Sequence, residues 1–87
     1  MVSVAGIETA YCFLHQKERV YRYSVLDWQR DDIEVAVAAY ADTMDPDLLA
    51  RLSGGTPDFL RDHSRFAADL RGAVETLGAL LEERRRG

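Results

Sequence analysis

The first third of the chain carries hydrophobic residues at the spacing of an amphipathic helix. Five of them recur at steps of three, four or seven positions: Ile7, Tyr11, Leu14, Tyr21 and Val25. The spacing predicts a helix over residues 4–23. A hairpin within residues 11–26 is the alternative, because aromatic and β-branched residues alternate there. We prefer the helix, since the hairpin turn at residues 16–18 would contain no residue that favours positive φ.

A second helix is predicted after Asp27. This carboxylate can cap a helix, because it can accept hydrogen bonds from the free amides of the first turn. The run over residues 33–41 is almost entirely apolar and presents hydrophobic residues on two faces. That pattern is typical of a central helix contacted on two sides. We therefore predict a helix over residues 28–43 and expect it to be the main element of the core.

Two further helices are predicted from an acceptor residue followed by proline. Asp45 and Pro46 start a short helix over residues 46–52, which Gly54 can end in the left-handed conformation. Thr56 and Pro57 repeat the start signal, and hydrophobic residues then alternate steps of four and three. These positions are Phe59, His63, Phe66, Leu70, Ala73, Leu77 and Leu80. The pattern predicts a long helix over residues 57–85.

The length of this last helix suggests a dimer. At 1.5 Å per residue it would span roughly 40 Å, longer than a compact globule of this size is across. We expect a second copy to cover its far end through a stripe formed by Leu70, Val74, Leu77 and Leu81. Gly72 and Gly78 weaken this helix, so the alternative to one continuous helix is a helix kinked at these positions.

The predicted fold class is therefore all-α. We expect residues 1–87 to form a single domain, a small bundle of three or four helices with a long C-terminal helix, and we expect the bundle to pair as a homodimer. The second and fourth helices should pack together through Ile33, Val37, Tyr40, Phe66, Leu70, Val74 and Leu77.

The composition of the chain indicates the compartment in which the protein is expected. The chain has 15 acidic and 11 basic side chains among 87 residues, with a single cysteine. Cys12 cannot form an intrachain disulfide, which favours a reducing compartment. Residues 1–6 lack a basic region ahead of an apolar run, and no 18 apolar residues stand together, so we expect a cytoplasmic protein outside the membrane. The excess of arginine over lysine suggests a bacterial source.

Catalytic and cofactor motifs are missing from the sequence. It contains no phosphate-binding loop, dinucleotide fingerprint, nucleophile elbow, paired-cysteine motif or zinc-protease motif. We therefore predict that the protein is not an enzyme and holds no cofactor. Glu8, Cys12 and His15 share one side of the first helix, but three residues on one helix do not close a metal site. We interpret Cys12 as a buried hydrophobe and His15 as partly exposed.

His63 is the titratable residue that stands out. It occupies an apolar position between Phe59 and Phe66, close to Asp58 and Asp62. We expect a buried histidine held by a carboxylate or a backbone carbonyl. The alternative is a pH-sensing or ligand-binding residue, as in a helical bundle that binds a metal or a small ligand.

The sequence pattern of residues 48–66 resembles that of a helix-turn-helix. A short helix, a glycine turn and a second helix with Arg61 and Arg65 would suit a DNA-binding regulator. Asp58 and Asp62 would face phosphate, however. The net charge of the chain is −4, whereas nucleic-acid binding requires a positively charged surface. DNA binding is therefore kept only as an alternative function.

Aromatic and arginine residues gather between the first two predicted helices. These types are enriched where proteins bury a partner. The predicted interaction surface comprises Tyr21, Arg22, Tyr23, Trp28 and Arg30. The alternative is that these aromatic side chains belong to the core and fill the angle between the two helices, which explains their presence equally well. The sequence thus favours a non-enzymatic interaction or adaptor module that pairs with itself, or else with another protein.

Overall fold

The computed structural model describes residues 3–86, which form four α-helices and one 3₁₀ helix. The elements are α1 (Val4–Tyr23), α2 (Asp27–Thr43), α3 (Pro46–Ser53), η1 (His63–Arg65) and α4 (Phe66–Arg86). This part of the chain contains no strand, so the all-α prediction is confirmed and the hairpin alternative is wrong. Residues 1, 2 and 87 lie outside the described part. The prediction that residues 1–6 carry no export signal therefore falls partly outside the described residues.

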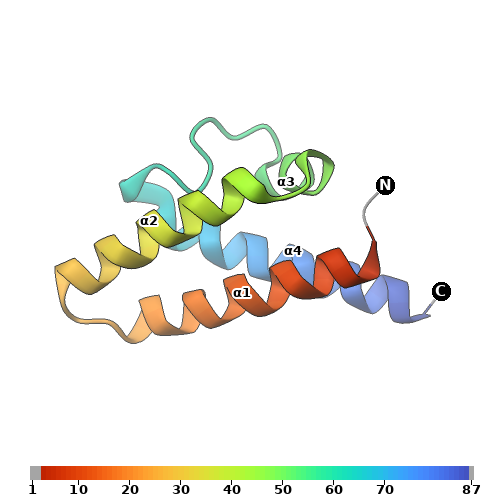
Figure 1. Cartoon of the computed structure of the whole chain (residues 1–87), viewed down its shortest axis with the longest axis horizontal. Helices are drawn as coiled ribbons and strands as arrows, with labels where there is room; N and C mark the ends of the chain where they lie inside the picture. Colours follow the sequence, from red (N-terminus) through yellow and green to blue (C-terminus); the bar gives the residue numbers. More distant parts are fainter. Residues whose placement is uncertain (1–2, 87) are drawn as a thin grey trace.

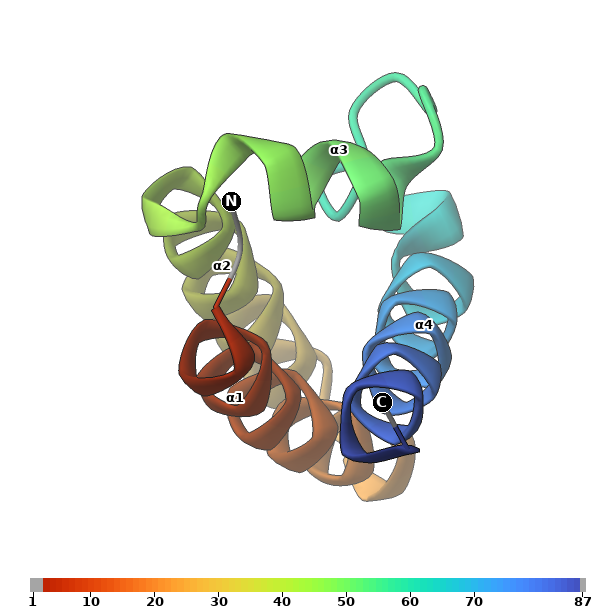
Figure 2. The same ribbon diagram turned by 90° about the vertical axis from the view of Figure 1, so that its right-hand side faces the viewer.

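The three long helices follow the long axis of the molecule, which measures 42 × 24 × 18 Å (Figure 1). The turn between α1 and α2 lies at one end, and the start of α1 and the end of α4 lie at the other. The short helix α3 lies across the bundle between α2 and α4 (Figure 2). No helix within residues 3–86 is both long and apolar enough to cross a membrane.

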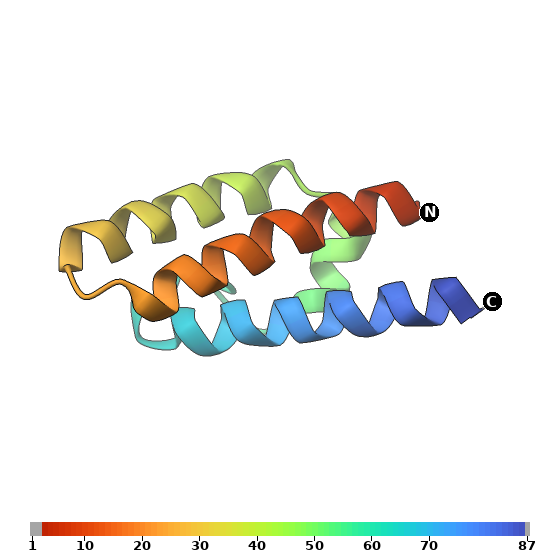
Figure 3. The same ribbon diagram turned by 90° about the horizontal axis from the view of Figure 1, so that it is seen from below.

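Helix α1 is the central element. It packs along α4 and also contacts α2, and it lies between them in Figure 3. Its inner face is fully buried at Ile7, Ala10 and Leu14. The prediction that the second helix is the main core element and packs chiefly on the fourth is wrong. Much of the apolar run in α2 is alanine, and Val35 is 70% exposed.

Helix α2 still contributes to the core that the sequence predicted. Ile33 and Val37 are buried there, and Phe66, Leu70 and Leu77 of α4 are fully buried. Two other predicted core residues, Tyr40 and Val74, are partly buried and pack against the cluster. The residues of the predicted core are thus largely correct, although their helices are arranged around α1.

Local start and stop signals account for several helix ends. The Asp45 carboxylate accepts hydrogen bonds from the amides of Asp47 and Leu48, as its predicted capping role requires. Gly54 ends α3 with φ of 58°. The predicted cap at Asp27 is wrong, because this residue is already inside the first turn of α2. An acidic residue in the first turn lies near the positive end of the helix dipole, which stabilises the helix.

The predicted start of the fourth helix is also wrong. Residues 54–65 form a loop that ends in η1, and α4 begins only at Phe66. Asp58 and Leu60 have φ values of 55° and 64°, which interrupt a right-handed helix. Leu60 keeps this conformation because its side chain is fully buried and its amide donates to the Asp69 carboxylate at 3.2 Å.

The stripe predicted for dimerisation is used inside one chain. Leu70, Leu77 and Leu81 are buried, and Val74 is half-buried against the core. Because α4 is shorter than predicted, α1 covers it, and the argument from an uncovered helix end no longer holds. Helix α4 is continuous through both glycines, and the Tyr11 ring approaches closely at Gly78.

Candidate functional site

Exposed hydrophobic side chains gather at the turn between α1 and α2. Seven large hydrophobic residues of the described chain are exposed, and five of them fall within residues 20–28. We call these five the turn surface: Val20 (50% exposed), Tyr23 (73%), Val25 (88%), Leu26 (47%) and Trp28 (61%). They occupy the end of the molecule opposite the start of α1 (Figure 1).

Polar contacts beneath the turn fix its conformation. The Ser24 hydroxyl donates to the carbonyl of Val20 at 2.7 Å, and the Arg30 side chain donates to the Ser24 carbonyl at 2.9 Å. The Arg30 guanidinium also lies 4.8 Å from the centre of the Tyr21 ring. With the backbone held from within, Val25 and Leu26 are left in solvent.

The structure divides the predicted interaction surface. Tyr23 and Trp28 are on the surface, but Tyr21 is 7% exposed and packs on Phe66 with ring centres 4.9 Å apart. The prediction that Tyr21 belongs to the surface is therefore wrong. Arg22 is exposed and forms an ion pair with the buried Glu18 at 2.5 Å.

Sequence reasoning missed the aliphatic part of the turn surface. Val25 and Leu26 stand between a serine that ends one helix and an aspartate that begins the next. Two adjacent hydrophobic residues in so short a connection were the available signal, because a three-residue turn leaves little backbone to fold back over the core.

The residues considered for a metal site on α1 do not form one. Cys12 is exposed, so its predicted burial is wrong. His15 is partly exposed, as expected, and stacks on Tyr11 with ring centres 5.2 Å apart. Among residues 3–86, no group of potential metal ligands combines Cys12 with Glu8 and His15.

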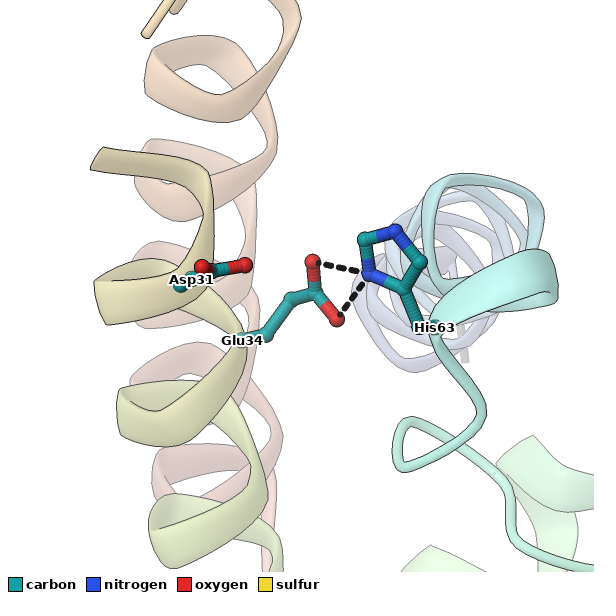
Figure 4. Close-up of side chains that lie close together, drawn as sticks. All are labelled: Asp31, Glu34 and His63. Atoms are coloured by element: carbon teal, nitrogen blue, oxygen red, sulfur yellow. Dashed lines mark hydrogen bonds and ion pairs between the residues drawn. The ribbon is translucent and has the colours of Figure 1, made fainter. Parts of the chain in front are cut away.

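His63 is exposed rather than buried, because it lies in η1 and not on the inner face of α4. Its side chain is 77% exposed. The predicted carboxylate partner is present, but it comes from α2 instead of the neighbouring aspartates. His63 Nδ1 lies 3.0 and 2.9 Å from the two carboxylate oxygens of Glu34 (Figure 4). The contact joins the start of the α4 segment to α2.

Asp31 completes a group that we call the acid–histidine cluster: Asp31, Glu34 and His63. One ligand atom from each residue lies within 4.8 Å of the others. The Tyr21 hydroxyl donates to Glu34 at 3.2 Å. Hydrogen bonding to Glu34 and its negative charge raise the pKa of His63, and burial followed by the Glu34 charge raises the pKa of Tyr21.

The segment that resembled a helix-turn-helix does not have that geometry. Residues 54–65 replace the expected short turn and the first turns of the second helix. Arg61 forms an ion pair with Asp42, and Arg65 donates to the carbonyl of Pro57 at 2.6 Å. Both arginines are thus engaged within the chain.

No protein-family model matches this chain, and no curated protein or solved structure was found to be significantly similar. Its function is therefore argued from the geometry of the described residues. Two features of that geometry are distinctive: the turn surface and the acid–histidine cluster.

Proposed function

We propose that this protein is a small protein–protein interaction module that pairs with a second copy of itself through the turn surface. The observation that carries the proposal is the exposure of Tyr23 and Trp28 beside three aliphatic side chains at one end of the molecule. Soluble monomers rarely leave a large apolar patch uncovered, and such patches mark interaction sites.

The residue types in the turn surface suit an interface. Tryptophan and tyrosine are enriched among the residues whose removal weakens association most. Burial of a large hydrophobic side chain stabilises by about 1.5–3 kcal/mol. Tyr23 and Trp28 are available for this, because neither is needed to cover the core of its own chain.

A second copy is the occupant that the surrounding charges favour. Arg19 is exposed on α1 next to Val20, and Asp27 and Asp32 are exposed on α2 on either side of Trp28 in the sequence. In a two-fold dimer the same patch faces itself, so the apolar centres meet and each arginine can approach a partner aspartate. A chain of 87 residues also has little core of its own, and a dimer buries more hydrophobic surface.

The test is the molar mass in solution, by light scattering after size exclusion over a range of concentrations. We expect the natural protein to be a dimer and the Tyr23→Ala, Trp28→Ala double variant to be a monomer with unchanged helical circular dichroism. Val4→Ala is the matched control. Val4 is an exposed hydrophobic residue at the opposite end of α1 from Tyr23. At 1.5 Å per residue the two are separated by about 30 Å along the helix.

Two results would overturn the proposal. A natural protein that is monomeric at every concentration would exclude self-pairing, and a dimeric double variant would move the interface to another surface. Val25→Asp provides a second, independent variant: with 88% of Val25 exposed, this charge should block pairing without disturbing the fold.

A further inference from the structure

The acid–histidine cluster brings potential metal ligands together from two separate segments. Asp31 and Glu34 are three residues apart on α2 and so share a face, and His63 approaches them from η1 (Figure 4). An ion held about 2.1 Å from its ligands in tetrahedral geometry separates those ligands by about 3.4 Å. The Nδ1 of His63 is already 2.9 Å from Glu34, and all three ligand atoms lie within 4.8 Å. Small side-chain rotations therefore suffice to enclose an ion.

The mixture of ligand types selects a class of metal. Two carboxylates alone would suit Ca²⁺ or Mg²⁺, which take oxygen ligands. An imidazole nitrogen in the set favours Zn²⁺ and similar transition metals. Three protein ligands also match the number that zinc sites use when one position stays open to water. A surface hollow lined by all three cluster residues adjoins the cluster, so that position is accessible to solvent.

The carboxylate at the centre of the cluster is held in place. The Glu34 side chain is only 16% exposed, and it accepts the hydroxyl hydrogen bond of the buried Tyr21. Hydrogen bonds of this kind orient metal ligands, and their loss typically weakens metal affinity by about 10- to 100-fold. His63 is positioned in turn by η1, whose start is capped by hydrogen bonds from Ser64 to Asp62.

We infer that Asp31, Glu34 and His63 form a binding site for one divalent transition metal ion, with Zn²⁺ as the expected ion. The metal replaces the hydrogen bond between His63 and Glu34 and links α2 to the segment that precedes α4. The site is separate from the proposed self-pairing, because none of its three ligands belongs to the turn surface.

The experiment is calorimetric titration of the chelator-treated protein with ZnCl₂, and with MgCl₂ and CaCl₂ for comparison. We expect one Zn²⁺ per chain and much weaker binding of the other two ions. His63→Gln and Asp31→Asn should each weaken Zn²⁺ binding by about 10-fold or more, and Tyr21→Phe should weaken it because Glu34 loses its orienting hydrogen bond.

Matched controls are available for both ligand types. His15→Gln removes the other histidine, and Asp32→Asn removes the exposed carboxylate next to Asp31. Both should leave Zn²⁺ binding unchanged. In nuclear magnetic resonance spectra, Zn²⁺ should shift the ring signals of His63 and leave those of His15 in place.

Three results would overturn the inference. They are the absence of Zn²⁺ binding, equal Zn²⁺ affinity in the His63→Gln variant, and binding of Ca²⁺ or Mg²⁺ as tight as that of Zn²⁺. The Tyr23→Ala, Trp28→Ala double variant should bind Zn²⁺ normally. Loss of self-pairing and loss of metal binding are therefore distinguishable.

Discussion

The two main connections of this protein differ in whether their hydrophobic residues are exposed or buried. The turn between α1 and α2 leaves Val25 and Leu26 in solvent, whereas the loop over residues 54–65 buries Leu60 completely. The first connection has too few residues to fold back over the core. The second has enough, and it places Leu60 inside by adopting a left-handed backbone. Hydrophobic residues in a connection thus become core or surface according to the length of chain around them.

Truncation of Leu60 should give the largest difference between the two connections. Leu60→Ala removes a fully buried side chain and is expected to lower the free energy of unfolding by about 2–5 kcal/mol. Val25→Ala should change it by less than about 0.5 kcal/mol, because Val25 contacts mainly solvent. Urea unfolding followed by circular dichroism, at a concentration where the protein is monomeric, measures both. Equal losses in the two variants would contradict the comparison.

Removal of the hydrogen bond that holds the long loop should give the next largest loss of stability. Asp69→Ala removes the carboxylate that accepts from the Leu60 amide, and it should destabilise the protein by about 1–3 kcal/mol. Asp69→Asn retains an oxygen acceptor and should lose less. Amide hydrogen exchange at Leu60 provides a local measurement. An unchanged exchange rate in the alanine variant would show that this contact does not hold the loop.

The contacts beneath the short turn should matter less. Arg30→Gln removes the hydrogen bond to the Ser24 carbonyl and the contact with the Tyr21 ring. We expect a loss of about 0.5–1.5 kcal/mol in the free energy of unfolding, measured in urea. Arg19→Gln is the control, because Arg19 is exposed on the neighbouring helix. Both variants are measured at a concentration where the protein is monomeric, so that the proposed self-pairing does not contribute. A larger loss from Arg19→Gln would mean that the turn is held differently.

The pair between His63 and Glu34, which joins the end of the long loop to α2, should give the smallest effect. Glu34, and to a lesser extent Asp31 and Asp27, raise the pKa of His63 above its ordinary value of about 6.5. The stabilisation is therefore fully present below about pH 6.5 and is lost as the pH rises through the raised pKa. Because His63 is exposed, we expect only a minor change in stability.

Magnetic resonance titration of the metal-free protein measures this pKa directly. The His63 ring should titrate at higher pH in the natural protein than in the Glu34→Gln variant. Identical titration curves would show that the two side chains are not paired in solution.

Local sequence signals were sufficient for much of the fold. Helical spacing located α1, and Asp45, Pro46 and Gly54 located α3, because these signals act within one or two turns of chain. The start of α4 could not be found in this way. The left-handed conformation at Leu60 depends on burial and on a contact with Asp69, nine residues away. The sequence pattern around Pro57 does not contain that information.

The candidate sites show the same limit. Their residue types made Tyr23 and Trp28 candidates for an interaction surface, but Tyr21 could not be separated from them without its contact with Phe66. For His63 the sequence predicts a carboxylate partner, but it does not show which one, and the predicted burial is wrong. Its partner Glu34 is 29 positions away, and only the packing of α2 beside η1 brings the two together.

The central claim is that the turn surface is where two copies meet, and Trp28 offers the most direct test. It is the only tryptophan, and 61% of it is exposed in the single chain. Its fluorescence emission should move to shorter wavelength as protein concentration rises, over the same range in which the molar mass doubles. An emission maximum that stays constant while the mass doubles, or a mass that never rises, would contradict the account.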